Sequence, residues 1–203
     1  MAEFINTIDV LGEDAVIDSI IDRSITEFKD DTLEKVGSYA FYGCTALAVV
    51  DLPNAVTIAY SGFYGCTALN SVNIPAVTSI DAYNTFSNCK ALKEITLPSC
   101  INIGQGAFSY CYALEEIHCN ASDKLTIGNN AFSYCPLKAL VLRSNSVATL
   151  SSINALSDTG VAKGSGYIYV PRTLVDGYKA ASNWSNYANQ FRAIEDYPEI
   201  TGG

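Results

Sequence analysis

The sequence has little positive charge and no long hydrophobic run. Its 203 residues carry 12 Lys and Arg against 21 Asp and Glu, which gives a net charge of −9. Nucleic-acid-binding proteins neutralise phosphates with clustered Lys or Arg, so this acidic chain argues against a nucleic-acid partner. No apolar run approaches the roughly 18 to 20 residues of a membrane-spanning helix, so we expect no membrane insertion.

The N-terminus lacks the basic segment and the apolar segment of a secretory signal peptide. We therefore expect a cytoplasmic or phage-associated protein, with surface display only by a route other than Sec. The acidic charge is concentrated at this end, because residues 1–34 carry ten acidic side chains against two basic ones.

Motifs for common chemistry are also missing. The sequence has no Gly-x-Ser-x-Gly elbow, no phosphate-binding loop, no Cys-x2-Cys pair and a single histidine. We therefore expect a non-enzymatic protein with no cofactor and no metal site.

What the sequence does contain is a repeat of about 22 residues. Phenylalanine recurs at Phe41, Phe63, Phe86, Phe108 and Phe132, with spacings of 22, 23, 22 and 24 residues. Three residues after each stands a cysteine, which gives Cys44, Cys66, Cys89, Cys111 and Cys135. A leucine and an alternating apolar pair close each unit, as in Leu47, Val50 and Leu52. Self-similarity at such a period indicates a solenoid.

The closing Leu-x2-Leu-x-Leu pattern is typical of leucine-rich repeats, and its last residues alternate as in a strand with one buried face. We predict an α/β fold: a right-handed leucine-rich-repeat solenoid of five to six turns. Parallel strands should line its concave face, helical or 3₁₀ turns its convex face, and caps should cover both ends.

The chain divides into four parts of one structural domain. We predict an acidic N-terminal cap over 1–35, five repeats over 36–143, a degraded sixth repeat over 144–171, and a C-terminal helical cap and tail over 172–203. The N-terminal cap should hold a helix over about 12–22 and a half-repeat strand from Ile25 to Phe28.

The C-terminal cap should begin with a helix from Thr173 to about Ala181. We expect Trp184, Tyr187 and Phe191 to cover the last turn of the solenoid, and Pro198 to Gly203 to form a frayed tail.

With its A-F-x-G-C-x-A-L-x-x-V-x-L-P units over 36–143, the chain resembles the BspA-type, Treponema-like leucine-rich-repeat family. The endings Tyr167-Ile168-Tyr169-Val170-Pro171 and Trp184-Ser185 carry the same resemblance. It implies a bacterial surface protein that attaches to host matrix proteins or to other cells, without catalytic residues. Short chains of this kind are also similar to proteins of gut Firmicutes and their prophages, which leaves a structural role on a phage particle or larger assembly open.

The five repeat cysteines should form a buried row of free thiols. Neighbours would lie about 5 Å apart in the stacking direction, but parallel side chains do not converge as a disulfide requires. A row also cannot supply the tetrahedral ligands of a zinc site. Cys119 replaces an inward leucine and should be buried, whereas Cys100 lies outside the pattern and is the candidate for an exposed thiol.

His118 stands between two inward residues, Ile117 and Cys119, so it should point outward beside Glu116 as a solvated strand residue. A catalytic dyad needs both side chains on one face, which the register denies to His118 and Cys119. Four tyrosines near the convex turns should serve mainly in packing: Tyr42, Tyr64, Tyr110 and Tyr134.

The outward positions of the strands form the candidate binding surface, an unknown protein or cell-surface ligand being the expected partner. The position between the apolar pair gives Asp51, Asn73, Thr96, His118, Val141 and Tyr169. The position two residues earlier gives Val49, Ser71, Glu94, Glu116, Ala139 and Tyr167. We expect two exposed parallel rows, tyrosine-rich at the C-terminal end, where aromatic side chains favour recognition.

Overall fold

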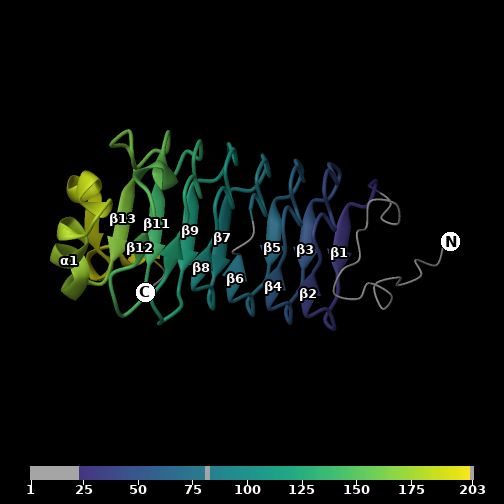
Figure 1. Cartoon of the computed structure of the whole chain (residues 1–203), viewed down its shortest axis with the longest axis horizontal. Helices are drawn as coiled ribbons and strands as arrows, with labels where there is room; N and C mark the ends of the chain where they lie inside the picture. The colour runs from purple at the N-terminus through teal and green to yellow at the C-terminus, as the bar shows by residue number, and fades with distance from the viewer. Residues whose placement is uncertain (1–22, 81–82, 202–203) are drawn as a thin grey trace.

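The alternating apolar segment of each repeat forms a short strand, as predicted. In the computed structural model, which describes residues 23–80 and 83–201, these strands are parallel and lie side by side, each running across the long axis of the molecule (Figure 1). They form two sheets, with the orders β1-β3-β5 and β7-β9-β11-β13-β14. Their bounds are β1 (Glu27–Lys29), β3 (Val49–Asp51), β5 (Ser71–Asn73), β7 (Glu94–Leu97), β9 (Glu116–Cys119), β11 (Ala139–Leu142), β13 (Tyr167–Val170) and β14 (Phe191–Ala193). We call the outer surface of these strands the long-strand face.

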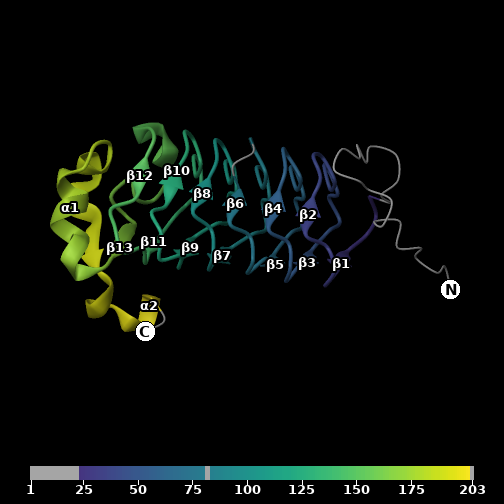
Figure 2. The same cartoon turned by 60° about the horizontal axis from the view of Figure 1, so that its bottom comes forward.

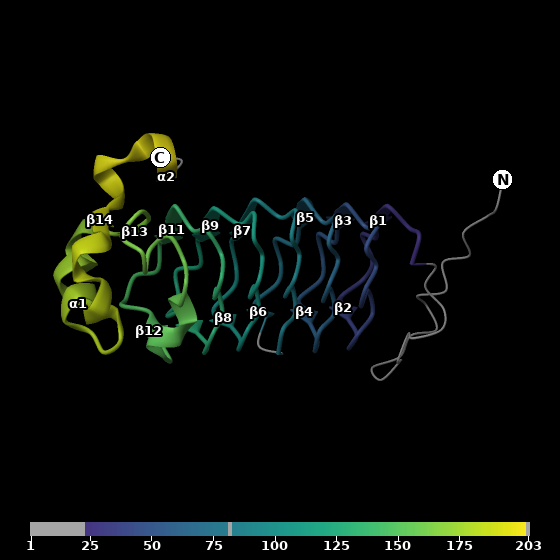
Figure 3. The ribbon, with the colours of Figure 1, turned by 90° about the horizontal axis from the view of Figure 1, so that it is seen from above.

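A third sheet, made of two-residue strands, was not predicted. It runs along the other side of the solenoid in the order β12-β10-β8-β6-β4-β2 (Figure 3). Its strands are β2 (Lys35–Val36), β4 (Thr57–Ile58), β6 (Ser79–Ile80), β8 (Asn102–Ile103), β10 (Thr126–Ile127) and β12 (Thr149–Leu150). The second residue of each strand is a buried Val, Ile or Leu, so each solenoid turn buries apolar side chains from two sides.

The Phe-x2-Cys segments form single turns with 3₁₀-type hydrogen bonds. In the first turn, the backbone N–H of Cys44 donates to the carbonyl of Phe41 (3.1 Å), and that of Phe41 donates to Gly62 in the next turn (2.7 Å). We call the surface of these segments the turn face. The tyrosines here pack on one another: Tyr42 stacks on Tyr64 and Tyr110 on Tyr134.

The repeat phenylalanines form a continuous ladder through the core. Successive rings from Phe41 to Phe132 have centroids 4.9 to 5.8 Å apart and planes within 21° of parallel. The cysteine thiols run beside this ladder and donate to its carbonyl groups. Cys66, for example, donates through Sγ to the carbonyl of Phe41 (3.1 Å), and Cys111 does the same to Phe86 (3.1 Å). The thiols therefore satisfy their hydrogen-bonding capacity inside the core.

The C-terminal cap closes the last turn with short helices (Figure 2). These are η2 (Ile153–Leu156) in the degraded repeat, then η3 (Arg172–Leu174), α1 (Val175–Ala180), η4 (Trp184–Gln190), η5 (Ile194–Asp196) and α2 (Pro198–Thr201). Trp184, Tyr187 and Phe191 are buried, as predicted.

Hydrogen bonds tie these aromatic residues to the solenoid. The Trp184 indole N–H donates to the carbonyl of Ala148 (2.7 Å), and the Tyr187 hydroxyl donates to that of Ile153 (2.9 Å). At the other end, β1 confirms the half-repeat strand, whereas the helix predicted over 12–22 lies outside the described residues. Over the part of the chain that the structure describes, no helix combines the length and hydropathy needed to cross a membrane.

Candidate binding surface

Within each sheet of longer strands, the parallel register aligns the predicted outward residues in two rows. Within the first sheet, Val49 pairs with Ser71 and Asp51 with Asn73. The second sheet aligns its residues in two series, Glu94–Glu116–Ala139–Tyr167 and Thr96–His118–Val141–Tyr169. Residues about 22 positions apart in the sequence are therefore direct neighbours on the long-strand face.

The N-terminal part of these rows is accessible. Ser71, Asn73, Glu94 and Thr96 are exposed, and four members are half-buried: Val49, Asp51, Glu116 and His118. The Asn73 amide donates to the Asp51 carboxylate (2.7 Å). This contact fixes the two side chains, which belong to neighbouring turns, relative to one another.

The imidazole of His118 is less solvated than predicted, because its side chain is only 18 % exposed and its Nε2 lies 3.6 Å from a carboxylate oxygen of Glu116. Acidic groups dominate this part of the long-strand face. It carries four carboxylates, those of Glu27, Asp51, Glu94 and Glu116, and one ammonium group, that of Lys29, which pairs with Glu27.

The C-terminal part of the rows is covered, which corrects the prediction that it is exposed. Ala139, Val141 and Tyr169 are buried, with Val141 0 % and Tyr169 3 % exposed. They form a small apolar cluster with Ile194, against which Tyr167, Tyr197 and Ile200 pack. The Tyr169 and Tyr197 rings meet edge to face at 5.4 Å.

The covering segment is the chain end that the sequence suggested would be frayed. Residues 194–201 fold back over the long-strand face near β11 and β13 instead (Figure 3). An ion pair between Arg172 and Asp196 anchors the segment, and the backbone N–H of Arg172 donates to the Glu195 carboxylate (3.1 Å). Burial under this segment raises the pKa of Tyr169. The ring of Tyr167 is only half-buried, and the Arg192 guanidinium lies over it, 4.2 Å from the ring centroid.

All seven cysteines of the chain lie among the described residues, where they are buried and form no disulfide. Burial raises the pKa of the thiols of Cys66, Cys111, Cys119 and Cys135, so they stay protonated and unreactive at neutral pH. The prediction that Cys100 is exposed was wrong, because its side chain is 0 % exposed.

Cys100 belongs to an inward column that the sequence pattern did not reveal. Ala55, Val77 and Cys100 stand three residues before the buried isoleucines of β4, β6 and β8, and all three are buried. The thiol of Cys100 donates to the carbonyl of Asn102 (3.3 Å). Among residues 23–80 and 83–201, no group of three or more His, Cys, Asp or Glu side chains is arranged to hold a metal ion.

Comparison with known proteins gives a family match and structural neighbours. The model of the BspA type leucine rich repeat region matches residues 22–155 with six copies of the repeat. A leucine rich cell surface protein from Faecalibacterium prausnitzii A2-165 is similar to 72% of this chain, with 27% identity and a TM-score of 0.57. A leucine-rich repeat protein from Bacteroides ovatus ATCC 8483 is similar to 74% of this chain, with 29% identity and a TM-score of 0.55.

The matched regions span 39% and 44% of those two chains, so this chain corresponds to less than half of either structure. A search of curated protein sequences finds no significant match.

Proposed function

Because the chain belongs to the BspA-type leucine-rich repeat family, we propose that it is a non-enzymatic binding module that holds a protein partner on the long-strand face. The supporting observation is the accessible outward residues from Val49 to His118, which are aligned between β3 and β5 and again between β7 and β9. Parallel rows of outward side chains on a rigid solenoid offer an extended surface for recognition. The similarity to a leucine rich cell surface protein supports an adhesive role, with a matrix or cell-surface protein as the partner.

The charge of this surface favours a basic partner segment. On the long strands from β1 to β9, four carboxylates stand against one ammonium group, and complementary charge steers association and sets specificity. The partner should contact the turns from β3 to β9, because the C-terminal segment occupies the rows at β11 and β13.

A double charge reversal tests this proposal. Glu94→Lys with Glu116→Lys should weaken binding to positive members of a matrix-protein array by at least about tenfold, because two neighbouring carboxylates become ammonium groups. Surface plasmon resonance at two salt concentrations would measure the loss, and the salt dependence of the association rate should shrink.

The matched control reverses two exposed carboxylates outside the long strands, Asp123→Lys with Asp176→Lys, for the same change in net charge. This control should keep its binding. If both double variants bind every array member as the unchanged protein does, the partner does not use the long-strand face.

A further inference from the structure

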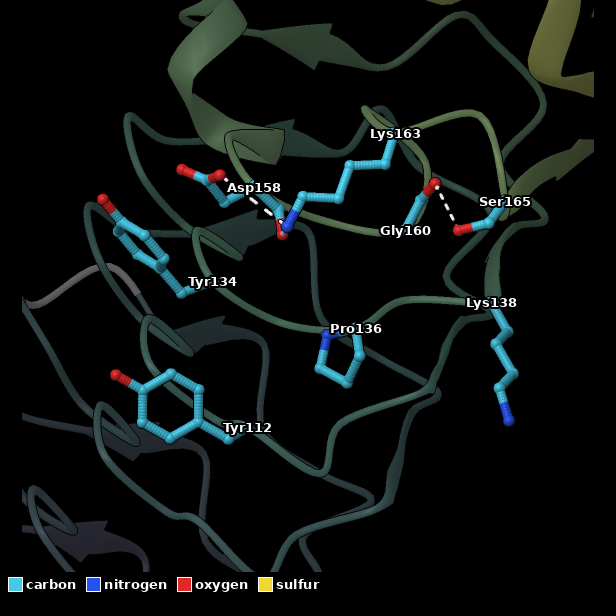
Figure 4. Close-up of a pocket in the computed structure, with 8 residues that line it drawn as sticks. All are labelled: Tyr112, Tyr134, Pro136, Lys138, Asp158, Gly160, Lys163 and Ser165. Atoms are coloured by element: carbon cyan, nitrogen blue, oxygen red, sulfur yellow. Dashed lines mark hydrogen bonds and ion pairs between the residues drawn. The ribbon is translucent and has the colours of Figure 1, made fainter.

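A pocket of about 520 Å³ lies near the C-terminal end of the turn face, and none of the residues that line it belongs to the two accessible rows (Figure 4). The residues that line it are Tyr112, Tyr134, Pro136, Lys138, Asp158, Gly160, Lys163 and Ser165. Its volume lies within the range of about 300 to 1,000 Å³ that is usual for small-molecule sites.

Two tyrosine rings form one side of the pocket, with Pro136 beside them (Figure 4). Tyr112 is 54% exposed and Tyr134 44%, so both rings are accessible to a ligand. Their positions are fixed through Tyr110, which stacks on Tyr134 at 4.8 Å with planes 8° apart and meets Tyr112 edge to face at 6.2 Å. The rings therefore present a flat apolar surface without needing to be ordered by a ligand.

The backbone at Tyr134 shows that the fold does not require a tyrosine at that position. Two residues after each repeat phenylalanine, or after Leu156 in the degraded repeat, the chain adopts a left-handed conformation with φ between 59° and 73°. We call these positions the turn column: Gly43, Gly65, Asn88, Tyr110, Tyr134 and Asp158.

Glycine and asparagine adopt this conformation readily, but tyrosine pays about 1–2 kcal/mol for it. The same turn is built with glycine in the first two repeats, so the ring of Tyr134 is not needed to form it. Strained residues of this kind cluster at ligand sites, although Tyr39 also has a left-handed φ of 60° outside the pocket.

The polar groups around the rings are both donors and acceptors, and their charges are balanced. Lys163 lies 3.7 Å from the Asp158 carboxylate and donates to the carbonyl of the same residue (2.9 Å). Lys138 pairs with Glu115 at 2.7 Å. Because each ammonium group has a carboxylate partner, the pocket favours a ligand without net charge.

Close backbone contacts and hydrogen bonds hold the loop beside the pocket in place. An added Cβ at Gly160 or Gly166 would collide with the carbonyl oxygen of Leu137, so only glycine allows this approach. The backbone N–H groups of Ser165 and Gly166 both donate to the carbonyl of Gly160 at 2.9 Å. A preformed wall lowers the entropy that binding must offset.

From these features we propose that the pocket binds a neutral saccharide. A sugar ring has an apolar C–H face that can lie against a tyrosine ring, and hydroxyl groups that both donate and accept hydrogen bonds. This matches the tyrosine wall and the mixed rim of Asp158, Lys163 and Ser165. A proline-rich peptide also fits aromatic grooves, but its proline residues lack N–H groups, so it offers fewer donors to the Asp158 carboxylate than a saccharide does.

An array of neutral, sialylated and sulfated oligosaccharides, printed together with proline-rich peptides, tests the proposal on the full chain. The protein should bind neutral oligosaccharides, and calorimetry with the best of them should give the affinity. Tyr112→Ala and Asp158→Asn should each weaken that affinity by about tenfold or more. Asn tolerates the left-handed conformation, so Asp158→Asn removes the carboxylate without straining the turn.

The Glu94→Lys, Glu116→Lys variant is the matched control, and its saccharide affinity should be unchanged because both residues lie on the long-strand face. Unchanged thermal melts would show that the pocket variants are folded. Binding of proline-rich peptides alone, binding restricted to charged glycans, binding that survives both pocket variants, or no binding at all would each overturn the proposal.

Discussion

The two ends of the solenoid share a core but differ on both faces. In the first three repeats the long-strand face is accessible, and the turn column carries Gly43, Gly65 and Asn88. In the last repeats the C-terminal segment covers the long-strand face, and the turn column carries Tyr110, Tyr134 and Asp158. Exposed tyrosines occur on the turn face at both ends, but only in the last repeats do they lie at the turn column.

This difference shows how a repeat protein can separate two surfaces. Each turn contacts mainly its neighbours, so an outward residue can change in one repeat without disturbing the core. The long-strand face of the N-terminal repeats and the turn face of the C-terminal repeats are therefore independent candidates for binding.

The largest expected effect is the pH dependence of the free energy of unfolding, which tests whether one core runs through both ends of the solenoid. The folded-state pKa values of Cys66, Cys111, Cys119 and Cys135 are raised by burial. Below the ordinary thiol pKa of about 8.5, the thiols are protonated in both the folded and the unfolded chain, and the free energy of unfolding is not reduced by their ionisation. As the pH rises above that value, the unfolded chain releases protons that the folded chain retains, so the free energy of unfolding falls. We expect the free energy of unfolding to fall by about 5 kcal/mol per pH unit above that point for four thiols.

Urea unfolding at pH 8 and pH 10 in a reducing buffer would measure this fall. Cys66→Ala and Cys135→Ala should each reduce the slope by about a quarter, although they lie at opposite ends. A slope that responds to only one of them would mean that the two ends do not unfold together. Maleimide labelling supplies a second readout, because all seven thiols should react only after unfolding.

The phenylalanine ladder gives a second test of the common core. Phe63→Ala and Phe132→Ala should each lower the free energy of unfolding by about 3–5 kcal/mol, since each removes a fully buried ring from a close-packed stack. Urea unfolding of both variants would compare the ends directly. A cost at Phe132 well below that at Phe63 would show that the C-terminal repeats relax around the cavity.

The core that both ends of the solenoid share is also the part of the molecule that the sequence predicts. Five recurrences of Phe, Cys and the apolar pair fixed the strand register, and the paired rows from Asp51 to His118 follow from it. The covering of Val141 and Tyr169 could not be predicted in this way, because Tyr197 and Ile200 occur once, outside any repeat.

The left-handed conformation of the turn column could not be predicted from the sequence for a different reason. Gly43 and Gly65 predict a left-handed turn, but Tyr110 and Tyr134 do not predict one at the equivalent positions. The burial of Cys100 was missed because its column, with Ala55 and Val77, stands just before the two-residue strands β4, β6 and β8, which are too short to show alternation.

Removing the C-terminal segment should make the two ends more alike. A chain that stops after Asp196 loses Tyr197 and Ile200, which pack on the cluster around Val141 and Tyr169. We expect the free energy of unfolding to fall by about 1–3 kcal/mol from the lost apolar burial. Hydrogen exchange should rise on β11 and β13 and stay unchanged on β3 and β5.

An alkaline titration followed by ultraviolet absorbance gives a second readout of the truncated chain. Burial raises the pKa of Tyr169 in the full chain, and this pKa should move back toward its ordinary value. If neither the exchange nor the titration changes, the segment does not hold its place on the long-strand face in solution.

The smallest effects come from exchanging turn-column residues between the ends. Gly65→Tyr should cost about 1–2 kcal/mol, because a tyrosine must adopt a φ of 73° there. Space is not the limit, since an added Cβ would meet no atom closer than 3.8 Å. Gly65→Asn should cost less, as asparagine tolerates this conformation and Asn88 already occupies it one repeat later.

The reverse exchange, Tyr134→Gly, should leave the free energy of unfolding within about 0.5 kcal/mol of its starting value. Relief of the left-handed strain is offset by the lost stacking on Tyr110 and by the greater freedom of glycine in the unfolded chain. Urea unfolding would measure both exchanges in parallel. A loss above about 2 kcal/mol would show that Tyr134 is present because it stabilises the turn and not because its ring serves the pocket. An unchanged free energy of unfolding together with lost saccharide binding would show that the ring contributes to binding and not to the fold.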